Sequence, residues 1–556
     1  MRTPVLLTLL ILIAASACHR DPDRTSLLTA ALREIVAGPP VLPVPEAVWT
    51  DVRRFYDQRE GAPAWLSNGN LSRANEALQV LQTARAHGFA PEDYGEPRLA
   101  ERLATLQQPT ASDKATAVKK PDTTGKDVPD RLREIAELDA GLTTALLAFG
   151  RDVAAGRTRP AAVDPRWKAR RELPDLAGTL GRAADGDLKT WIDSVRPSHP
   201  EYAALQQALT DLQAQREKGG WPKVPGGAFA PGRSNPSVIA LRQRLTASGH
   251  LTGSAASNTS PMYTNEDEAG VRAFQELHAL KGTGIADAAT LAAMNVPLDH
   301  RIHQIEVNLE RWRWMPNDFG PRHLMVNIPY YHLMARENGK TVMDIRVVVG
   351  KPDEHKTPVF SSEMSTVVFS PYWNIPDSIV EGETAPSVAR DPAYLAKNNI
   401  EILDMSKSGG TPVDAARVDW DDAAQLKHLA FRQKPGPNNA LGHVKFLFPN
   451  EFDVYLHDTP ADALFARPGR AFSHGCVRVE EPEALAKYIL RGYPEWDDAH
   501  MLEAMNAGVE KHVKLKETIP VHIVYFTAWV DEKGGLHFQP DVYGYDAQQM
   551  AHIRSL

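Results

Sequence analysis

The chain has 556 residues, of which 43% are hydrophobic and 24% charged, a balance typical of globular domains with substantial cores. Its formal net charge is −8, so the bulk electrostatic attraction to nucleic acid that a basic protein has is absent. At roughly 100–200 residues for each domain, this length predicts about two to four domains.

Residues 1–17 are typical of a signal peptide for export. A single basic residue precedes an apolar run from Val5 to about Ala15, which is shorter than the roughly 20 residues of a membrane span. Cleavage after Ala17 would make Cys18 the first residue of the mature chain, which resembles a bacterial lipoprotein signal. We therefore expect a periplasmic protein anchored by lipid on Cys18. Because His19 rather than Asp follows the cysteine, the resemblance to the sorting rules of two-membrane bacteria implies the outer membrane. Plain secretion, with an incidental cysteine, is the alternative.

Helical periodicity dominates the chain up to about residue 218. Apolar residues recur at three- and four-residue spacing through 26–108 and again after residue 130. Between these parts, 109–130 lacks aromatic residues and is rich in Thr, Lys, Asp and Pro, which indicates a flexible insert. A stretch rich in Gly and Pro at 219–234 predicts a linker.

Residues 235–297 predict a compact unit of short helices. Asn265 and Glu268 have the spacing of a capping box, and Asp287 is expected to cap the next helix. The segment resembles the three-helix type of peptidoglycan-binding domain. The residues that carry this resemblance are Leu241, Leu245, Gly249, Val271, Phe274-Gln275, Leu280, Gly284, Thr290-Leu291 and Asn295. A helical spacer that binds nothing would have the same apolar spacing and stays an alternative.

The pattern changes to strands at about residue 321, after a connecting helix expected at 298–320. Asn338-Gly339 between two alternating runs predicts a hairpin, and further strand-like runs continue to about residue 545. Segment 377–442 interrupts these strands and is partly helical in pattern. We expect it to be an insertion into a mostly β domain.

A cysteine and a histidine give the strongest chemical signal in this domain. Cys476 is the only cysteine besides Cys18, it follows Ser-His-Gly, and His457 precedes it at a probable strand end. A thiol attacks as the thiolate, and a nearby imidazole or cation lowers its pKa. A sharp turn at Gly475 would also point successive backbone N–H groups at one place, as an oxyanion hole requires. The residues are therefore candidates for acyl transfer.

Two other interpretations stay open on chemistry alone. A single buried cysteine is often an inert apolar side chain. The second interpretation is metal binding by Cys476, His474 and His457, although the sequence has no CxxC, HxH or HExxH spacing here. On the residues themselves, a catalytic and a structural role are equally compatible with the sequence.

The wider sequence resembles the L,D-transpeptidases with a YkuD-like catalytic domain. "HDTP…RAFSHGCVRV" matches their active-site signature of a histidine, a gap and Ser-His-Gly-Cys-Val-Arg. "SPYWNIPDSI", "PGPNNALGHVKFLFPN" and "ARAHGFAPEDY" extend the likeness to the large periplasmic members. It covers nearly the whole mature chain, except the insert at 109–130 and a stretch near 184–234.

The resemblance implies a multidomain α+β fold, with a helical scaffold domain, a small three-helix peptidoglycan-binding-like domain and a mostly β catalytic domain with a helical insertion. The expected boundaries are 1–17 for the signal peptide, 18–218 for the scaffold domain, 219–234 for the linker, 235–297 for the peptidoglycan-binding-like domain, 298–320 for the connecting helix and 321–545 for the catalytic domain with a lid-like insertion at 377–442.

The implied activity is transfer of a peptidoglycan stem peptide through a cysteine thioacyl-enzyme. Cys476 would attack the third residue of a tetrapeptide stem and release D-alanine, and the amine of another stem would then form a 3→3 cross-link. Carbapenems are implied to acylate the same cysteine, and no cofactor is needed. The residues expected in catalysis are Cys476 as nucleophile, His457 as base and acid, Asp458 to orient the ring through its carbonyl or its carboxylate, Gly475 together with Cys476 as backbone oxyanion donors, and Tyr455 as a hydroxyl donor.

Four further residues have alternative roles. Arg478 is expected to bind a substrate carboxylate or to clamp backbone carbonyls, and His474 to tune the thiolate or brace the turn. Ser473 is interpreted as a turn-stabilising hydroxyl, and Trp373 as part of the groove or of the core. The same active site would serve an L,D-carboxypeptidase or the attachment of a protein lysine to peptidoglycan. A peptidoglycan-anchoring protein is the non-enzyme alternative, and a permanently packed layer is the alternative to a lid.

Overall fold

The computed structural model describes residues 24–66, 71–108, 130–168, 171–227, 229–406, 410–420 and 422–554. The expected signal peptide, Cys18 and residues 109–129 of the expected insert lie outside the described residues. The chain divides into two compact units, of which the first comprises Met1–Arg85, Phe89–Val153 and Pro174–Arg196 and the second comprises Ala86–Gly88, Ala154–Leu173 and Pro197–Leu556. Among the described helices, none has the length and apolar character needed to cross a membrane.

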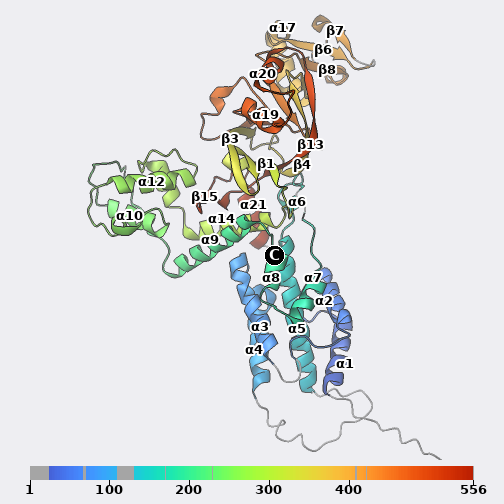
Figure 1. The fold of residues 1–556 in the computed structure, drawn as a ribbon, viewed down its shortest axis with the longest axis vertical. Helices are drawn as coiled ribbons and strands as arrows, with labels where there is room; N and C mark the ends of the chain where they lie inside the picture. The colour runs from blue at the N-terminus through green and yellow to red at the C-terminus, as the bar shows by residue number, and fades with distance from the viewer. Residues whose placement is uncertain are drawn as a thin grey trace, which may run out of the picture. The chain divides into compact units, whose positions relative to one another are not determined.

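The first unit is built from helices (Figure 1). Its α2 helix shows why they form, since Val48, Val52 and Phe55 recur at helical spacing and all are buried. The helices are α1 Arg24–Ala37, α2 Glu46–Gln58, α3 Ser72–Gln82, α4 Glu96–Gln107, α5 Asp130–Ala155, α7 Leu176–Asp185 and α8 Trp191–Val195.

A buried carboxylate organises the core of this unit. Asp139 on α5 has no exposed surface and accepts hydrogen bonds from the Tyr56 hydroxyl at 2.6 Å and from the Trp65 backbone N–H at 2.8 Å. The backbone N–H groups of Ala64 and Leu66 also donate to it. Burial raises the pKa of Asp139, and these donors offset part of that effect. The carboxylate thereby fixes the chain after α2 against α5.

We expect Asp139→Ala to lower the free energy of unfolding of the first unit by about 3 kcal/mol, because several buried donors would lose their acceptor. Asp185→Ala is the control, since it removes only an exposed ion pair with Arg59 and should cost less than about 1 kcal/mol. Urea unfolding followed by circular dichroism measures both. Equal midpoints for the two variants would contradict this role of Asp139.

The second unit begins with helices and then contains a small helical core of its own. Its helices up to the sheet are α6 Pro160–Val163, α9 Pro200–Glu217, α10 Val238–Ala247, α11 Gly253–Ala256, α12 Asn265–Leu277, α13 Ala288–Met294 and α14 Leu298–Trp312. Between α10 and α13, Leu241, Val271, Phe274 and other apolar residues form a separate buried cluster. The buried Arg242–Asp267 ion pair, at 2.6 Å, ties α10 to α12.

Helix caps in this region are close to those expected from the sequence. Asp287 caps α13 by accepting the Thr290 N–H at 2.9 Å, as predicted. The capping box of α12 consists of Thr264 and Asp267, so the prediction of Asn265 and Glu268 was wrong by one residue. The buried ion pair between Asp267 and Arg242 selects this register, because it gives the Asp267 carboxylate an ionic partner as well as the cap.

The remaining part of the chain folds around a nine-stranded sheet in the order β11-β3-β12-β10-β9-β4-β13-β1-β2. Because β2 also pairs with β3, the sheet closes on itself. Strand β11 pairs with β3 as well, so little free strand edge remains. The strands are β1 Arg322–Asn327, β2 His332–Glu337, β3 Lys340–Gly350, β4 Phe360–Phe369, β9 Val444–Leu447, β10 Leu456–His457, β11 Ala471–Ser473, β12 Val477–Val479 and β13 Lys511–Val524.

Short additions surround this closed sheet. Asn338-Gly339 forms the predicted turn between β2 and β3, and both residues have positive φ as such a turn requires. A separate hairpin consists of β14 Ala528–Val530 and β15 Leu536–Phe538. Helices α19 Pro482–Leu490 and α20 Asp498–Asn506 lie between β12 and β13 in the chain, and α21 Tyr545–Arg554 follows the hairpin.

The insertion expected at 377–442 is more strand-rich than its sequence pattern indicated. It supplies three strands, β6, β7 and β8, of an antiparallel sheet in the order β5-β8-β6-β7, whose strand β5 directly precedes it (Figure 1). The strands are β5 Trp373–Ile375, β6 Ile400–Asp404, β7 Thr411–Val413 and β8 Leu429–Gln433, and the helices are α15 Asp377–Ile379, the π-helix η5 Val380–Thr384, α16 Ala385–Arg390, α17 Tyr394–Lys397 and α18 Ala423–Leu426. Its apolar residues form their own buried cluster. The expected multidomain α+β class is confirmed, and the insertion is a mixed rather than a helical one.

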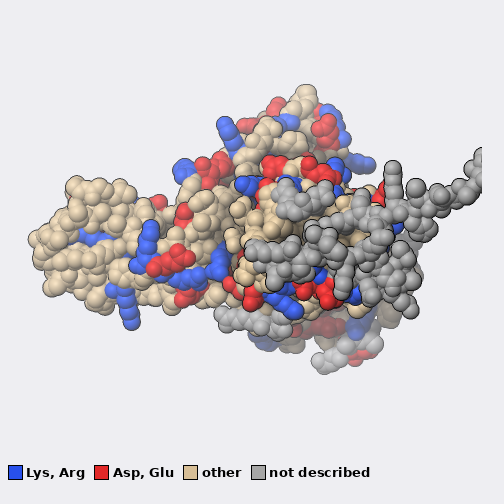
Figure 2. Space-filling view, turned by 90° about the horizontal axis from the view of Figure 1, so that it is seen from below, with Lys and Arg blue, Asp and Glu red and all other residues tan. Residues whose placement is uncertain are grey.

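Among the described residues that are visible in Figure 2, acidic and basic side chains are interspersed.

Candidate active site

Two short parallel strands bring the predicted catalytic residues together. Leu456 of β10 pairs with Val477 of β12, and His457 pairs with Arg478. Leu456 and Val477 are fully buried in the domain core. Side chains alternate along a strand, so the opposite face carries the residues of the sequence motif. These residues are Tyr455, His457, Cys476 and Arg478.

The Cys476 thiol is partly exposed and neutral in this environment. Its Sγ lies 3.7 Å from the Asp453 carbonyl oxygen, to which the S–H donates. Burial raises the pKa of Cys476 to about 11, although hydrogen bonds from Tyr455 and the positive charge of Arg478 act to lower it. Tyr455 therefore contacts the Cys476 sulfur, in agreement with its expected position as a hydroxyl donor.

The His457 imidazole is buried and is held in one orientation by the backbone. Its Nδ1 donates to the Asp458 carbonyl oxygen at 2.5 Å, which leaves Nε2 as the proton acceptor. Burial, together with the positive charges of Arg478 and Lys445, lowers the pKa of His457 to about 3. Between these described residues no direct hydrogen bond joins the sulfur to the imidazole. Such bonds often tighten only when substrate is bound.

Of the two ways in which Asp458 was expected to orient the ring, the structure uses the carbonyl. The Asp458 carboxylate is occupied elsewhere, since it accepts the backbone N–H groups of His443 at 2.7 Å and Thr459 at 2.6 Å. It packs against Gly442, where a Cβ atom would lie 2.2 Å from the carboxylate oxygen. The carboxylate thus fixes the loop before β9 to the end of β10.

The turn before the nucleophile depends on Gly475 and Ser473. Gly475 has φ +116°, a conformation that side-chain-bearing residues rarely adopt. The Ser473 hydroxyl donates to the Cys476 carbonyl at 2.5 Å and accepts the Gly475 N–H at 3.2 Å. The N–H of Gly475, predicted as an oxyanion donor, is therefore occupied, whereas the Cys476 N–H has no partner among the described residues.

The residues expected to bind substrate have different surroundings. Arg478 forms no hydrogen bond with the described chain, and its Nε is buried without a partner. His474 points toward the insertion, where its Nε2 pairs with Glu383 of η5 at 2.9 Å. Trp373 lies on β5 and packs against the apolar cluster of the insertion. Arg478 is thus the one of the three whose polar atoms are available next to the thiol.

Comparisons with known proteins assign the parts of the chain. Residues 50–209 match the model of the Scaffold domain, 234–294 that of a "Putative peptidoglycan binding domain" and 321–496 that of the "L,D-transpeptidase catalytic domain", YkuD. Residues 321–496 form a YkuD-type L,D-transpeptidase domain. The geometry around Cys476 and His457 belongs to this domain.

A curated relative supports this assignment over part of the chain. A "Putative L,D-transpeptidase" of Haemophilus influenzae is 36% identical over 245 residues, which are 44% of this chain and 48% of the relative. The chain thus spans about half the length of the relative that it matches.

Solved L,D-transpeptidase structures are more distant. That of Xylanimonas cellulosilytica is 15% identical and covers 54% of this chain and 99% of its own, with a TM-score of 0.18. That of Stackebrandtia nassauensis is 12% identical and covers 55% of this chain and 96% of its own, with a TM-score of 0.21.

Two residues that the sequence motifs did not indicate, Thr357 and Tyr543, brace the nucleophile turn. The buried Thr357 hydroxyl donates to the Gly475 carbonyl at 2.7 Å and accepts the Gly350 N–H at 2.9 Å. The Tyr543 hydroxyl donates to the Gly350 carbonyl at 2.8 Å and accepts the Thr357 N–H at 3.1 Å. They connect the end of β3 to the turn. A sequence pattern offers no signal for them, because both lie far from Cys476 along the chain.

The described residues contain no group of three or more His, Cys, Asp or Glu side chains that could hold a metal ion.

We expect the alkylation rate of Cys476 by iodoacetamide to rise about tenfold for each pH unit between about pH 7 and 10. With a thiol pKa of about 11, the thiolate fraction is small and still increasing over this range, and His457, with a pKa of about 3, stays neutral throughout. Mass spectrometry of the modified protein measures the rate, and Cys476→Ala is the blank. A plateau between about pH 6 and 8 would instead indicate a preformed thiolate–imidazolium pair.

Proposed function

We propose that this protein is an L,D-transpeptidase that forms 3→3 cross-links in peptidoglycan through a thioacyl-enzyme on Cys476. The observation that carries the proposal is the parallel pairing of β10 with β12. It places the thiol, the imidazole and the Tyr455 hydroxyl on one face of a domain that matches the L,D-transpeptidase catalytic family. The match of 234–294 to a peptidoglycan-binding model supports peptidoglycan as the substrate polymer.

In the first half of the reaction, the Cys476 sulfur attacks the carbonyl carbon of the third stem residue. A C–S bond forms, and the thiol proton passes to Nε2 of His457. The tetrahedral intermediate then breaks the C–N bond to D-alanine, whose nitrogen takes the proton back from Nε2. A buried, neutral imidazole whose Nδ1 is held by the Asp458 carbonyl can take the proton from the thiol and give it to the D-alanine nitrogen. The Nε2 atom then acts first as proton acceptor and next as proton donor.

The second half transfers the acyl group to an amine. The side-chain amine of another stem attacks the thioester, its proton passes to His457, and the C–S bond breaks. The thiolate then regains the proton. Water in place of the amine would make the enzyme an L,D-carboxypeptidase, and a protein lysine would make it an attachment enzyme. The same residues would serve each acceptor.

Two donors are available for the oxyanion. The Cys476 backbone N–H is free among the described residues, and the Tyr455 hydroxyl lies at the sulfur. We assign both to the oxyanion, with Gly475 supplying the turn rather than a free donor. Arg478 is assigned to a substrate carboxylate, since a guanidinium whose buried Nε lacks a partner would gain charge-assisted bonds from it.

We expect Cys476→Ala to abolish both D-alanine release and covalent modification by a carbapenem, with the fold intact. His457→Ala should slow acylation by about a hundredfold or more while binding changes little. Incubation with tetrapeptide muropeptides and mass analysis of the products measures the reaction. Dimers indicate transpeptidation, and tripeptides alone indicate a carboxypeptidase. A carbapenem adduct on Cys476→Ala would refute the nucleophile, and no turnover by the unchanged protein would favour an anchoring protein.

We also propose that the insertion at 377–442 is a lid that keeps water from the thioester. A thioester surrounded by water is transferred to an amine only if the amine is positioned and water is excluded. The pairing of Glu383 with His474, two residues before the nucleophile, connects the insertion to the active-site turn. The insertion's own apolar core supports its movement as one body.

We expect Glu383→Gln to increase the ratio of hydrolysed tripeptide to cross-linked dimer by about threefold to tenfold, because the insertion would lose a contact at the turn. Glu381→Gln, an exposed carboxylate of the same π-helix, is the matched control and should keep the original ratio. Chromatography of the products measures both. An unchanged ratio in a folded Glu383→Gln protein would favour a permanently packed layer.

We propose that the mature protein is anchored by lipid on Cys18 to the outer membrane, in the periplasm. Cys18→Ser should then move the protein from the membrane fraction to the soluble fraction, because the acyl chains supply the membrane affinity. Cell fractionation with immunoblotting measures this. A mature N-terminus that begins after Cys18 would contradict lipidation and favour plain secretion.

A further inference from the structure

Lys445 lies beside the catalytic histidine in the sheet. It is directly opposite His457 in the antiparallel pairing of β9 with β10. Side chains of directly opposite residues point to the same face, with Cβ atoms about 4.5–5.5 Å apart. On the other side of His457, the paired residue is Arg478 of β12. The imidazole therefore lies between two cationic residues in one row across the sheet.

Lysine is an unusual residue at such a sheltered position. Only 14% of the Lys445 side chain is exposed, and lysine ammonium groups are rarely buried without a partner. Burial lowers the pKa of Lys445, whereas the negative charge of Glu510 acts in the opposite direction. The partners of the ammonium group therefore indicate what it does.

The ammonium group and Glu510 together hold the backbone of one residue. Lys445 Nζ donates to the Tyr372 carbonyl oxygen at 3.2 Å and lies 3.7 Å from Glu510 Oε1. The same carboxylate oxygen accepts the Tyr372 N–H at 2.9 Å. An ion pair thus binds both backbone polar groups of Tyr372, with the cation on β9 and the carboxylate on the residue before β13.

Tyr372 is the point at which the chain leaves the closed sheet for the insertion. It directly precedes β5, which pairs with β8 of the insertion. The returning chain is tied to the same place, because the buried Asn439 side chain donates to the Pro371 carbonyl at 3.1 Å and to the Lys434 carbonyl at 3.0 Å. The two connections of the insertion meet here, so a lid that moves as one body would turn about this point.

The position of Lys445 also has an electrostatic consequence for His457. The charged groups that act on the imidazole are Arg478 from β12 and Lys445 from β9. The titratable groups of the same face are Tyr455 and Cys476. Burial and the two positive charges favour the neutral imidazole, which can accept the thiol proton. Beside two cations, the imidazolium is also a stronger acid toward the D-alanine nitrogen.

We propose that Lys445 is a positioning residue of the active site. Its ammonium group fixes the start of the insertion at Tyr372 and places a positive charge beside His457. The insertion is thereby seated on the strand next to the catalytic base, and Lys445 acts through these two residues rather than on the reacting atoms. This inference rests on the proposed function, since it concerns which acceptor reaches the thioester and how the base carries the proton.

The test is Lys445→Met in the full-length mature protein, because methionine has a similar length and removes the charge and the donors. We expect the ratio of hydrolysed tripeptide to cross-linked dimer to rise about fivefold, since the start of the insertion would be held less firmly and water would reach the thioester. We also expect the acid limb of carbapenem acylation to move up by about one pH unit, because loss of a positive charge favours the imidazolium. Product chromatography measures the ratio, and intact-mass spectrometry measures acylation against pH.

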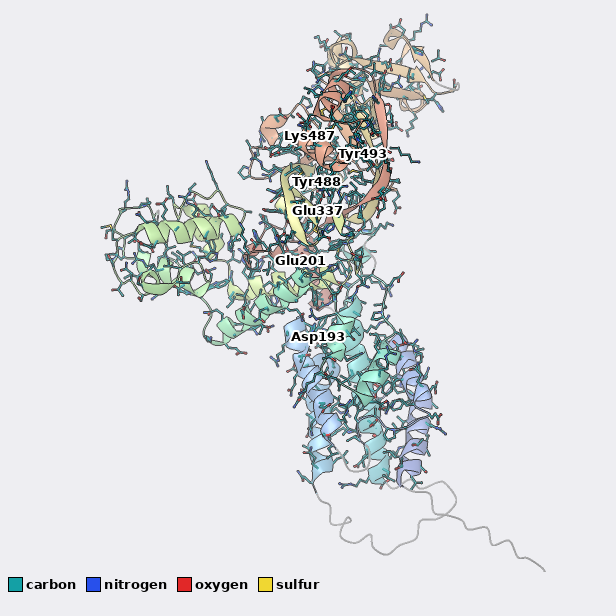
Figure 3. The ribbon with its side chains drawn as sticks, in the orientation of Figure 1. Asp193, Glu201, Glu337, Lys487, Tyr488 and Tyr493 are labelled. Atoms are coloured by element: carbon teal, nitrogen blue, oxygen red, sulfur yellow. The ribbon has the colours of Figure 1, made fainter. Side chains whose placement is uncertain are left out.

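Three further variants separate the two effects. Lys445→Arg should restore both readouts, since a guanidinium supplies the charge and the donors. Glu510→Ala should raise the product ratio without moving the acid limb upward, because it frees the Tyr372 N–H and keeps the cation. Lys487→Met is the matched control, because it removes a lysine on α19 that pairs with Glu483 of the same helix (Figure 3). It should change neither readout.

Circular dichroism at each pH establishes which variants are folded. If a folded Lys445→Met protein keeps either the product ratio or the pH profile of the unchanged protein, the inference is wrong. Turnover with unchanged readouts in Lys445→Met overturns only the role of this lysine. No turnover by the unchanged protein overturns the proposed activity, and the role of Lys445 with it.

Discussion

The pairing of β10 with β12 is the interaction on which the active site depends. Only two residue pairs form it, and Leu456 and Val477 anchor it by complete burial in the core. A shift of one residue would turn the chemical face inward and the apolar face outward. The closed sheet and the bonds of Thr357 and Tyr543 hold the strands in this register. The whole domain therefore serves to position a pair of very short strands.

Burial at this site has a chemical consequence. Burial gives His457 and Cys476 surroundings of low polarity, which lower the pKa of the imidazole and raise that of the thiol. The resting pair is consequently neutral, and the attack has to be coupled to proton transfer. A neutral thiol is also less reactive toward chance electrophiles. Tyr455 and Arg478, which act to lower the thiol pKa, would have more effect once substrate excludes the remaining water.

Much of the fold was predictable because its signals are local. Helical spacing in the first unit, the Asn338-Gly339 turn and the Asp287 cap depend on residues within one or two turns of the chain. The insertion was predicted less well, because its short strands alternate weakly and are stabilised by pairing between distant segments such as β6 and β8. The capping box of α12 lies one residue earlier than expected, since a buried Arg242 selects Asp267.

The sequence by itself determined the chemical groups of the site: one thiol, a histidine at a strand end and a glycine turn. It also indicated the face that they share, because strand alternation is a local rule. Only the tertiary structure decided which atoms are free to act. It occupies the Gly475 N–H and the Asp458 carboxylate, pairs His474 with Glu383, and gives Arg478 no partner among the described residues. Hydrogen-bond partners and burial come from segments distant in sequence, which no local pattern encodes.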